Sequence, residues 1–353
     1  MAKLLLIGPG SIHLWRYLTM VKEGFDELKV ISDRLPEPQF SGDFEVQVAN
    51  FSLRNPLAFM KTIKLIRQVI LSFQPDIIHT HQVGTEALAV NLAIRNQTIP
   101  LVLTAWGSDI LVAPDQSLIL KKIVTYNLRQ AAIITSDSLF MAQKMRELVP
   151  ESHLQIRLAN FGIGIQPDPT VAKENLIYSN RLHEKLYRID RIIQEFKNFL
   201  QTQTEPWTLV LAGTGSETAG LRQLVKDLGI EGKVEFTGWL APEKNAHYYH
   251  RAKLYVSIPQ SDATSISLLE AMACGCIPVV ADLPANHEWI IDGVNGIIVA
   301  DLDSPFLSEA LNLDLDLVQR VNRCQITQKA TVQVNRNKFL ALYAELIKVR
   351  SSS

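Results

Sequence analysis

The sequence has little of several features that each point to a particular class of protein. Only three of its 353 residues are Cys, and Cys274 and Cys276 are separated by one residue, not by the two of a zinc knuckle or a thioredoxin-like motif. With 35 Lys and Arg against 36 Asp and Glu, the formal net charge of −1 provides no global field that would attract nucleic acid. We therefore expect reduced packing cysteines, no nucleic-acid partner and a cytoplasmic compartment.

Long apolar runs are also missing from the sequence. Leu4–Ile7 is too short for the apolar region of a signal peptide, and no run reaches the roughly 18 residues of a spanning helix. We expect a protein that neither carries a secretory signal nor crosses a membrane. Residues 116–129 place Lys121, Lys122 and Arg129 among apolar residues. This stretch predicts either a core helix or a peripheral contact with anionic lipid on the inner face of the membrane.

What is present is a regular alternation of short apolar runs with longer amphipathic stretches. This pattern is typical of strands that are buried on both faces of a parallel sheet, with helices between them. The first half of the chain therefore predicts a doubly wound α/β domain, in which Pro56–Phe73 and Thr85–Arg95 are helices. Its expected strands are Lys3–Ile7, Leu28–Ser32, Glu45–Ala49, Ile77–His79, Leu101–Ala105 and Ala132–Ser136.

The pattern restarts after the turn-rich segment 166–169. The expected strands of a second sheet are Leu176–Ser179, Trp207–Ala212, Lys233–Phe236, Leu254–Ile258, Ile277–Val280 and Gly296–Val299. We therefore expect two Rossmann-like α/β domains, residues 1–165 and 166–334, that face a central cleft, and a C-terminal helix, 335–349, that packs back on the first domain. Ligands of open parallel sheets bind outside the carboxyl ends of the strands, so the site is expected at those ends.

The first of these ends is the loop Gly8-Pro9-Gly10-Ser11, which joins a strand to a helix. Free backbone N–H groups and the helix dipole favour a phosphate or another anion at such a turn. His13 stands where a dinucleotide fingerprint has its third glycine. Asp33 follows the second strand, about 20 residues after the loop, where that fingerprint has its ribose-binding carboxylate. The loop predicts an anion site or merely a tight turn, and an NAD-dependent epimerase or dehydrogenase stays open as an alternative.

Residues 259–278 carry the most informative motif. A predicted strand leads into a loop of small residues and then into a helix, and Asp262 and Glu270 lie eight residues apart. Carboxylates suit the recognition of sugar hydroxyls because each oxygen accepts hydrogen bonds, while the loop amides and the helix N-terminus favour a diphosphate. Ser267 and Glu270 also fit a capping box, so the alternative role of Glu270 is to cap its own helix.

Asp262-x7-Glu270 and the Ala-Met-Ala-Cys-Gly that follows resemble the Glu-x7-Glu signature of the retaining family 4 glycosyltransferases of the GT-B fold. The one departure within the signature is Asp262, which stands in place of the first Glu. The resemblance extends in register over essentially the whole chain. It is also carried by Pro75–His81, Leu103–Asp109, Asn160–Ile163, Val210–Gly215, Glu235–Trp239 and Asp292–Gly296.

The resemblance implies transfer of a sugar from a nucleotide diphosphate donor, a UDP- or GDP-sugar, to a hydroxyl of a glycan or lipid-linked acceptor, with no metal or other cofactor. It implies that Arg181 and Lys185 hold the diphosphate, with Arg188 as the alternative to Lys185, and that Asp262 orients the sugar. The implied donor-binding residues are Gly8, Gly10, Gly213, Gly238, Ser265, Ile266, Ser267, Leu268 and Glu270. The implied acceptor-side residues are Ser11, His81, Trp106 and Asp109. The expected context is the synthesis of cell-surface polysaccharide or glycolipid.

Trp106 occupies the place of a family His near the donor sugar. A Trp cannot exchange protons, which fits a retaining mechanism in which the leaving diphosphate itself accepts the proton of the acceptor. Together with the departure at Asp262, Trp106 leaves a second alternative open, a catalytically silent GT-B subunit that binds a nucleotide sugar or a partner enzyme. The sequence leaves the oligomeric state open.

Two patterns bear on metal binding. We expect His79 and His81 to lie on opposite faces of their strand, which argues against a shared metal ion. The Asp-x-Asp triplets at 301–303 and 314–316 have the form that holds a metal on a nucleotide sugar in the other large glycosyltransferase fold. Their late position in a chain with two complete α/β patterns favours loop or helix-start carboxylates instead.

Overall fold

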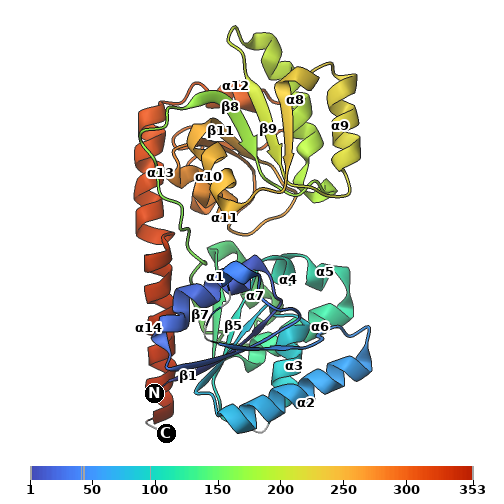
Figure 1. Cartoon of the computed structure of the whole chain (residues 1–353), viewed down its shortest axis with the longest axis vertical. Coiled ribbons are helices and arrows are strands. Elements are labelled where there is room, and N and C mark those ends of the chain that lie inside the picture. Colours follow the sequence, from blue (N-terminus) through green and yellow to red (C-terminus); the bar gives the residue numbers. More distant parts are fainter. Residues whose placement is uncertain (1, 41, 43, 96, 352–353) are drawn as a thin grey trace. The chain divides into compact units, whose positions relative to one another are not determined.

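The computed structural model describes residues 2–40, 42, 44–95 and 97–351 and divides the chain into two units, each built on its own parallel sheet (Figure 1). The first unit consists of residues 1–162 and 332–353, and the second of residues 163–331. These divisions lie three residues before the expected boundaries at 165 and 334. The two parallel sheets confirm the predicted fold class of paired Rossmann-like domains.

The first unit contains a seven-stranded sheet with the order β3-β2-β1-β4-β5-β6-β7. Its central strands are apolar and buried, as is usual for a parallel sheet that is covered on both faces, and Leu4–Ile7 of β1 have no exposed surface. The strands are β1 (Lys3–Gly8), β2 (Glu27–Ser32), β3 (Glu45–Val48), β4 (Ile77–His81), β5 (Leu101–Thr104), β6 (Ile133–Ser136) and β7 (Ile156–Leu158).

Several helices of the first unit begin at a side-chain cap. Asn55 accepts a hydrogen bond from the amide of Ala58, and Pro56 occupies the first turn, so α2 begins at the predicted residue. Ser138 caps α7 in the same way through the amide of Met141. The helices that connect the strands are α1 (Ile12–Val21), α2 (Pro56–Phe73), α3 (Thr85–Ala93), α4 (Ser108–Leu111), α5 (Ala113–Gln116), α6 (Leu118–Gln130) and α7 (Leu139–Leu148).

The C-terminal helix α14 (Val332–Ser351) belongs to the first unit. Its Phe339 and Tyr343 are buried in the same hydrophobic cluster as α1. The Tyr343 hydroxyl lies 2.5 Å from Nδ1 of His79 on β4 and forms a further hydrogen bond with the hydroxyl of Tyr17 on α1. The helix is therefore tied to this unit by both apolar burial and a buried polar network.

The second unit contains a six-stranded parallel sheet with the order β10-β9-β8-β11-β12-β13. Its strands are β8 (Glu174–Ser179), β9 (Thr208–Ala212), β10 (Val234–Gly238), β11 (Ala252–Ser257), β12 (Ile277–Ala281) and β13 (Ile297–Val299). Its helices are α8 (Ile189–Thr202), α9 (Thr218–Asp227), α10 (Pro242–Arg251), α11 (Ile266–Ala273), α12 (Phe306–Ala310) and α13 (Leu315–Lys329). Side chains of α8, α9 and α12 form one buried cluster with the sheet, and those of α10 and α11 form another.

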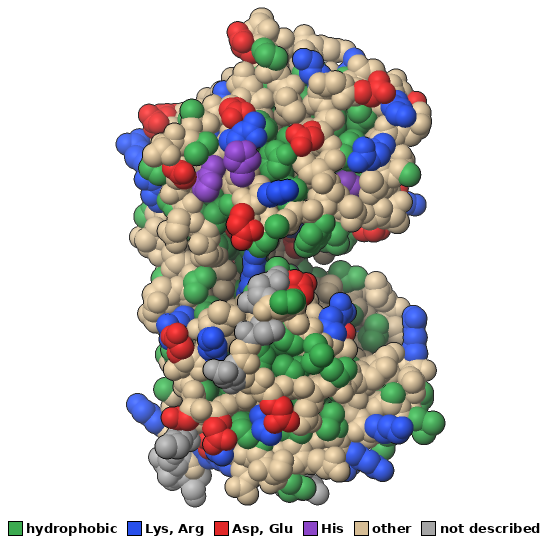
Figure 2. Space-filling model, in the orientation of Figure 1, with side chains coloured by type: hydrophobic (Ala, Val, Ile, Leu, Met, Phe, Trp, Pro, Cys, Tyr) green, Lys and Arg blue, Asp and Glu red, His purple; other side chains and the backbone are tan. Residues whose placement is uncertain are grey.

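All twelve predicted strands overlap an observed strand, and among the described residues β7 is the one strand that was not predicted. Arg157 and Leu158 of β7 are exposed, so this strand lacks the continuous apolar run that marks the others. No helix in the described ranges has both the length and the apolarity to cross a bilayer. On the face shown in Figure 2, cationic and anionic side chains are interspersed, in keeping with the balanced composition.

Candidate active site

The loop between β11 and α11 lies at the carboxyl edge of the second sheet. Ser265 is the N-cap of α11, and its hydroxyl accepts a hydrogen bond from the amide of Leu268 at 3.4 Å. The predicted capping box was wrong, because Ser267 lies inside the first turn of the helix and not at its N-cap position. The first-turn amides of an α-helix have no acceptor within the helix, so this end of α11 presents N–H groups and the positive end of the helix dipole.

Arg181 reaches this loop from the end of β8, the neighbouring strand. Its Nη1 donates to the Ser265 hydroxyl at 2.6 Å, and its Nη2 donates to Oδ2 of Asp262 at 2.8 Å. The guanidinium also lies over the ring of Tyr187, with 4.6 Å between its central carbon and the ring centroid. Burial raises the pKa of Asp262 above its ordinary value, although Arg181 opposes that shift. Three contacts thus fix one cation beside the N-terminus of α11.

Two predicted donor-binding glycines support the backbone of Arg181. Gly213 follows β9 with a φ of +113°, and its amide donates to the carbonyl of Gly238 at 2.7 Å. A Cβ atom at Gly213 would lie 2.7 Å from the carbonyl oxygen of Arg181. Only glycine accommodates both this backbone conformation and this approach, so Gly213 and Gly238 position the strand end that carries Arg181.

Glu270 lies on α11 just over one turn beyond Ser265 and is half-buried. Its charge contributes to the raised pKa values of Tyr178 and Tyr249, after the larger effect of their burial. Ile266 and Ser267 are half-buried residues of the first turn, whereas the side chain of Leu268 is buried in the core. Leu268 could therefore contact a donor through its backbone amide and not through its side chain.

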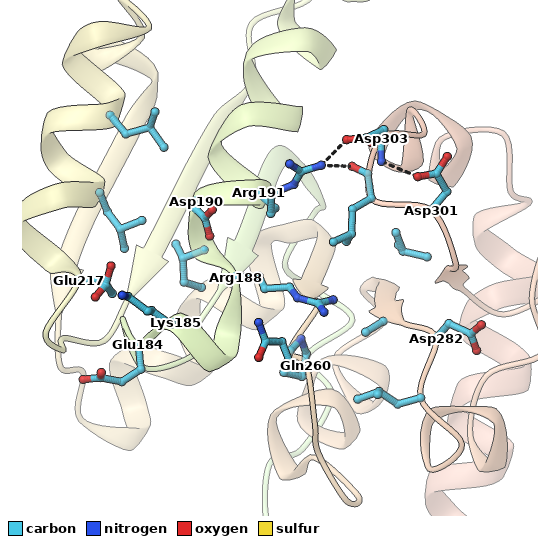
Figure 3. A pocket seen from close by; sticks show the side chains of 18 of the residues that line it. Glu184, Lys185, Arg188, Asp190, Arg191, Glu217, Gln260, Asp282, Asp301 and Asp303 are labelled. Atoms are coloured by element: carbon cyan, nitrogen blue, oxygen red, sulfur yellow. Dashed lines mark hydrogen bonds and ion pairs between the residues drawn. The ribbon is translucent and has the colours of Figure 1, made fainter.

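Lys185 does not join the group formed by Arg181, Asp262 and Ser265. It begins the short 3-10 turn η3 (Lys185–Tyr187) and is exposed. Lys185 and Arg188 both line a neighbouring pocket of about 960 Å³ at the carboxyl edge of the same sheet (Figure 3). The structure thus brings three of the predicted donor-side residues together and places Lys185 in the adjacent pocket.

In the first unit, the loop after β1 forms a close-packed turn. A Cβ atom on Gly8 would lie 2.9 Å from Cβ of His81, and the amide of Gly10 donates to Oδ1 of Asp33 at 2.6 Å. Ser11 is the N-cap of α1 and accepts a hydrogen bond from the amide of His13. The carboxylate that a dinucleotide would need for its ribose is thus bonded to an amide of this loop. This contact disfavours the NAD alternative.

The structure contradicts the expected orientation of the two histidines of β4. The rings of His79 and His81 lie side by side, with centroids 4.7 Å apart, because residues i and i+2 of a strand point to the same face. The indole N–H of Trp106 donates to Nδ1 of His81 at 3.1 Å. Burial lowers the pKa of His81 well below its ordinary value, and the nearby His79 and His13 lower it further. His81 is therefore a neutral, buried acceptor for Trp106.

Asp109 is buried and holds two loops together. Its Oδ2 accepts the amide of Val83 at 2.8 Å, and its Oδ1 accepts the amide of Trp106 at 3.0 Å. Glu86, which the sequence did not single out, lies in the first turn of α3, just after β4. Burial and the charge of Asp109 raise the pKa of Glu86 to about 7. Its position after the carboxyl end of a strand was the only signal that could have identified it.

The two Asp-x-Asp triplets have local structural roles. Oδ1 of Asp301 accepts the amide of Asp303 at 2.9 Å, and Asp314 caps α13 through the amides of Asp316 and Leu317. Among the described residues, no group of three or more His, Cys, Asp or Glu side chains is placed to hold a metal ion. The triplets thus behave as loop and helix-start carboxylates.

Two family models match the chain, one over each unit. A model described as glycosyl transferases group 1 matches residues 166–328, and one described as glycosyl transferase 4-like matches residues 3–138. The chain thus combines a group 1 glycosyltransferase domain with a glycosyl transferase 4-like domain, and it is a glycosyltransferase of the GT-B type. Solved structures agree on the fold of this glycosyltransferase. A glycosyltransferase from Rickettsia africae has a TM-score of 0.78 at 16% identity, with 98% of this chain and 99% of that chain covered. HepE from Anabaena in complex with UDP has a TM-score of 0.75 at 18% identity, with coverages of 98% and 100%.

Curated relatives are similar over part of their length. N-acetyl-alpha-D-glucosaminyl L-malate synthase of Bacillus anthracis is 28% identical over 238 residues, which are 63% of this glycosyltransferase and 61% of that protein. Alpha-monoglucosyldiacylglycerol synthase of Streptococcus pneumoniae is 24% identical over 290 residues, 75% of this chain and 63% of that protein. The match thus spans less than two thirds of the length of these relatives.

Proposed function

We propose that this glycosyltransferase moves a sugar from a UDP- or GDP-sugar to an acceptor hydroxyl with retention of anomeric configuration, in the synthesis of cell-surface polysaccharide or glycolipid. The observation that carries the proposal is the position of Arg181, a largely buried cation held by Asp262 and Ser265 beside the N-terminus of α11. A fixed cation and helix amides that face the same point form a site for a diphosphate.

Each donor-side residue has a role in this proposal. Arg181 neutralises the charge that builds on the departing diphosphate, which is electrostatic stabilisation of the transition state. The backbone from Ser265 to Leu268 supports the same phosphates, Asp262 orients the sugar, and Glu270 accepts hydrogen bonds from the ribose hydroxyls. Lys185 is assigned a weaker, screened interaction with the donor, since its side chain is exposed.

The proposed chemistry requires no base from the acceptor side. The bond between the anomeric carbon and the diphosphate oxygen breaks, the bond to the acceptor oxygen forms on the same face, and the acceptor proton passes to the leaving diphosphate. Trp106 offers no exchangeable proton of suitable acidity, and His81 already accepts the indole N–H. Trp106, His81, Ser11 and Asp109 therefore shape the acceptor side in this proposal and do not transfer protons.

Thermal unfolding with UDP, GDP, ADP and CMP and their sugars, with and without magnesium, tests the donor site, because a ligand that binds only the folded state raises the midpoint. We expect a metal-independent shift with one nucleoside diphosphate that is lost in Arg181→Ala. A shift with NAD alone would contradict the proposal and restore the dehydrogenase alternative. Donor binding without any turnover, with a cell extract as the source of acceptor, would instead support a catalytically silent subunit.

We also propose that the enzyme acts in the cytoplasm and contacts the inner face of the membrane through the start of α6. Leu118 and Ile119 expose 79% and 68% of their surfaces there, and Lys121 and Lys122 are exposed beside them. Leu118→Ser should reduce co-sedimentation with vesicles of anionic lipid. The matched control is Leu71→Ser on α2, where the leucine exposes 70% of its surface outside the proposed contact. Equal binding by the two variants would contradict this contact.

A further inference from the structure

The pocket of about 960 Å³ in the second unit is distinct from the group around Arg181. It lies where the segments after β8, β11, β12 and β13 meet the first turns of α8 and α9 (Figure 3). Neither Arg181, Asp262 nor Ser265 lines it. The segment 259–262 runs between the two places, because Gln260 lines the pocket whereas Asp262, two residues later, is paired with Arg181.

Arg188 enters this pocket from an unusual backbone conformation. It is the residue before α8 and has φ 51° and ψ 41°, in the left-handed region that side chains other than Gly, Asn and Asp rarely occupy. Its side chain supplies no hydrogen bond that caps the helix. An arginine at this position therefore strains the backbone, and its side chain does not cap the helix. Such strained residues cluster at sites where a side chain binds a ligand.

Arg188 brings hydrogen-bond donors without a protein partner into the pocket. Three other ionic side chains of the lining have partners: Arg191 pairs with Asp303, Asp282 with His287, and Glu184 with the amide of Ser216. Within the described part of the chain, the half-buried guanidinium of Arg188 and the side-chain amide of Gln260 have no hydrogen-bond or ion-pair partner. Figure 3 shows the Arg188 side chain lying above Gln260 and reaching toward the side of the pocket that carries Asp282 and Asp301.

We propose that this pocket is a second ligand site, in which Arg188 and Gln260 bind the phosphate group of a sugar phosphate. A guanidinium makes paired hydrogen bonds to phosphate, and an amide N–H₂ adds a neutral donor. Asp282 and Asp301, whose carboxylates are already held by partners within the unit, retain acceptor capacity for the hydroxyl groups of the same ligand. The ligand is therefore an anionic polyol, separate from the diphosphate proposed at Arg181.

Calorimetric titration with glucose 6-phosphate, inorganic phosphate and glucose tests this site. The titrations are made in the Arg181→Ala background, so that phosphate cannot bind through Arg181. We expect glucose 6-phosphate to bind, and Arg188→Asn to reduce its affinity at least about tenfold, since a hydrogen bond to a charged group is lost. Glucose should bind at least about tenfold more weakly than glucose 6-phosphate. The same titrations on the otherwise unsubstituted chain give the comparison should Arg181→Ala fail to fold.

The choice of Asn separates binding from folding. Asn adopts the left-handed conformation more readily than Arg, so Arg188→Asn should leave the thermal midpoint equal to or above that of the unsubstituted protein. Arg188→Lys should retain part of the affinity because it keeps the charge. Arg222→Gln is the matched control, since Arg222 lies over the ring of Phe236 and does not line the pocket.

Three outcomes would overturn the proposal. The first is that glucose 6-phosphate does not bind the Arg181→Ala protein, and the second is that Arg188→Asn and Arg222→Gln bind it with the same affinity. The third is that Arg188→Asn abolishes the shift caused by a nucleoside diphosphate, which would place Arg188 in the donor site instead.

Discussion

Acid should destabilise the first unit through the two histidines of β4. His79 and His81 have no exposed surface, and burial lowers the pKa of His79 to about 3 and that of His81 well below its ordinary value. Nε2 of His79 lies 2.6 Å from the hydroxyl of Thr104, and its Nδ1 contacts the hydroxyls of Tyr17 and Tyr343. Both rings are therefore neutral in the folded protein over the ordinary pH range.

The sign and size of the effect follow from these pKa values. An unfolded His titrates near its ordinary pKa of about 6.5, so below that pH the unfolded chain binds protons that the folded chain does not. The stability that the neutral rings contribute is fully present above about pH 6.5 and is lost as the pH falls towards the folded pKa of His79 near 3. At about 1.4 kcal/mol per pH unit, His79 lowers the free energy of unfolding by about 2 kcal/mol between pH 6.5 and 5, and His81 acts in the same direction. A loss of this size is a substantial part of the roughly 5–15 kcal/mol that typically stabilises a domain.

Native-state hydrogen exchange measures this effect in the first unit alone. The free energy of opening is obtained for the amides of β1 and β4 between pH 5 and 8. Glu86 of the same unit, with a pKa of about 7, has the opposite effect, and His13, with a pKa of about 4, adds to the effect of His79. The effect of His79 is therefore obtained from the difference between the unsubstituted protein and a variant that lacks this ring. His79→Asn keeps a polar group that can bond to Thr104 but removes one titrating ring. Between pH 6.5 and 5 its opening free energy should therefore fall by about 2 kcal/mol less than that of the unsubstituted protein, a difference of about one proton in the slope.

The control is His153→Asn, because His153 is exposed. This variant should show the slope of the unsubstituted protein. Equal slopes for His79→Asn and the unsubstituted protein would refute the assignment to His79.

Three further changes have defined outcomes. Asp262→Ala should relax the choice of donor sugar more than it weakens nucleotide binding, which competition between UDP-sugars and UDP measures. Gly213→Ala should raise the KM for the donor at least about tenfold, because a Cβ atom 2.7 Å from the carbonyl oxygen of Arg181 displaces that strand end; an unchanged KM would contradict the positioning role of Gly213. Tyr343→Phe removes a buried hydrogen bond to His79 and should lower the free energy of urea unfolding by about 1 kcal/mol.

The fold was predictable because its main determinant is local in sequence. Apolar runs such as Leu4–Ile7 are buried on both faces of a parallel sheet, and this requirement marks a strand without knowledge of its neighbours. The carboxyl ends of parallel strands meet at one edge, so Arg181 after β8 and Asp262 after β11 could be expected near each other. The hydrogen bond between them, across 81 positions of sequence, depends on side-chain rotamers that no local pattern encodes.

The site details that escaped prediction depend on burial and on long-range pairing. The amphipathic pattern of the C-terminal helix predicts that Tyr343 faces a core, but not that its hydroxyl meets His79, which lies 264 positions earlier. Arg188 carries no unusual signal in the sequence, since the strain at this residue is a property of its backbone angles. A sequence pattern therefore locates the edge at which ligands bind, whereas the assignment of Lys185 and Arg188 to a pocket beside Arg181 required the positions of their side chains.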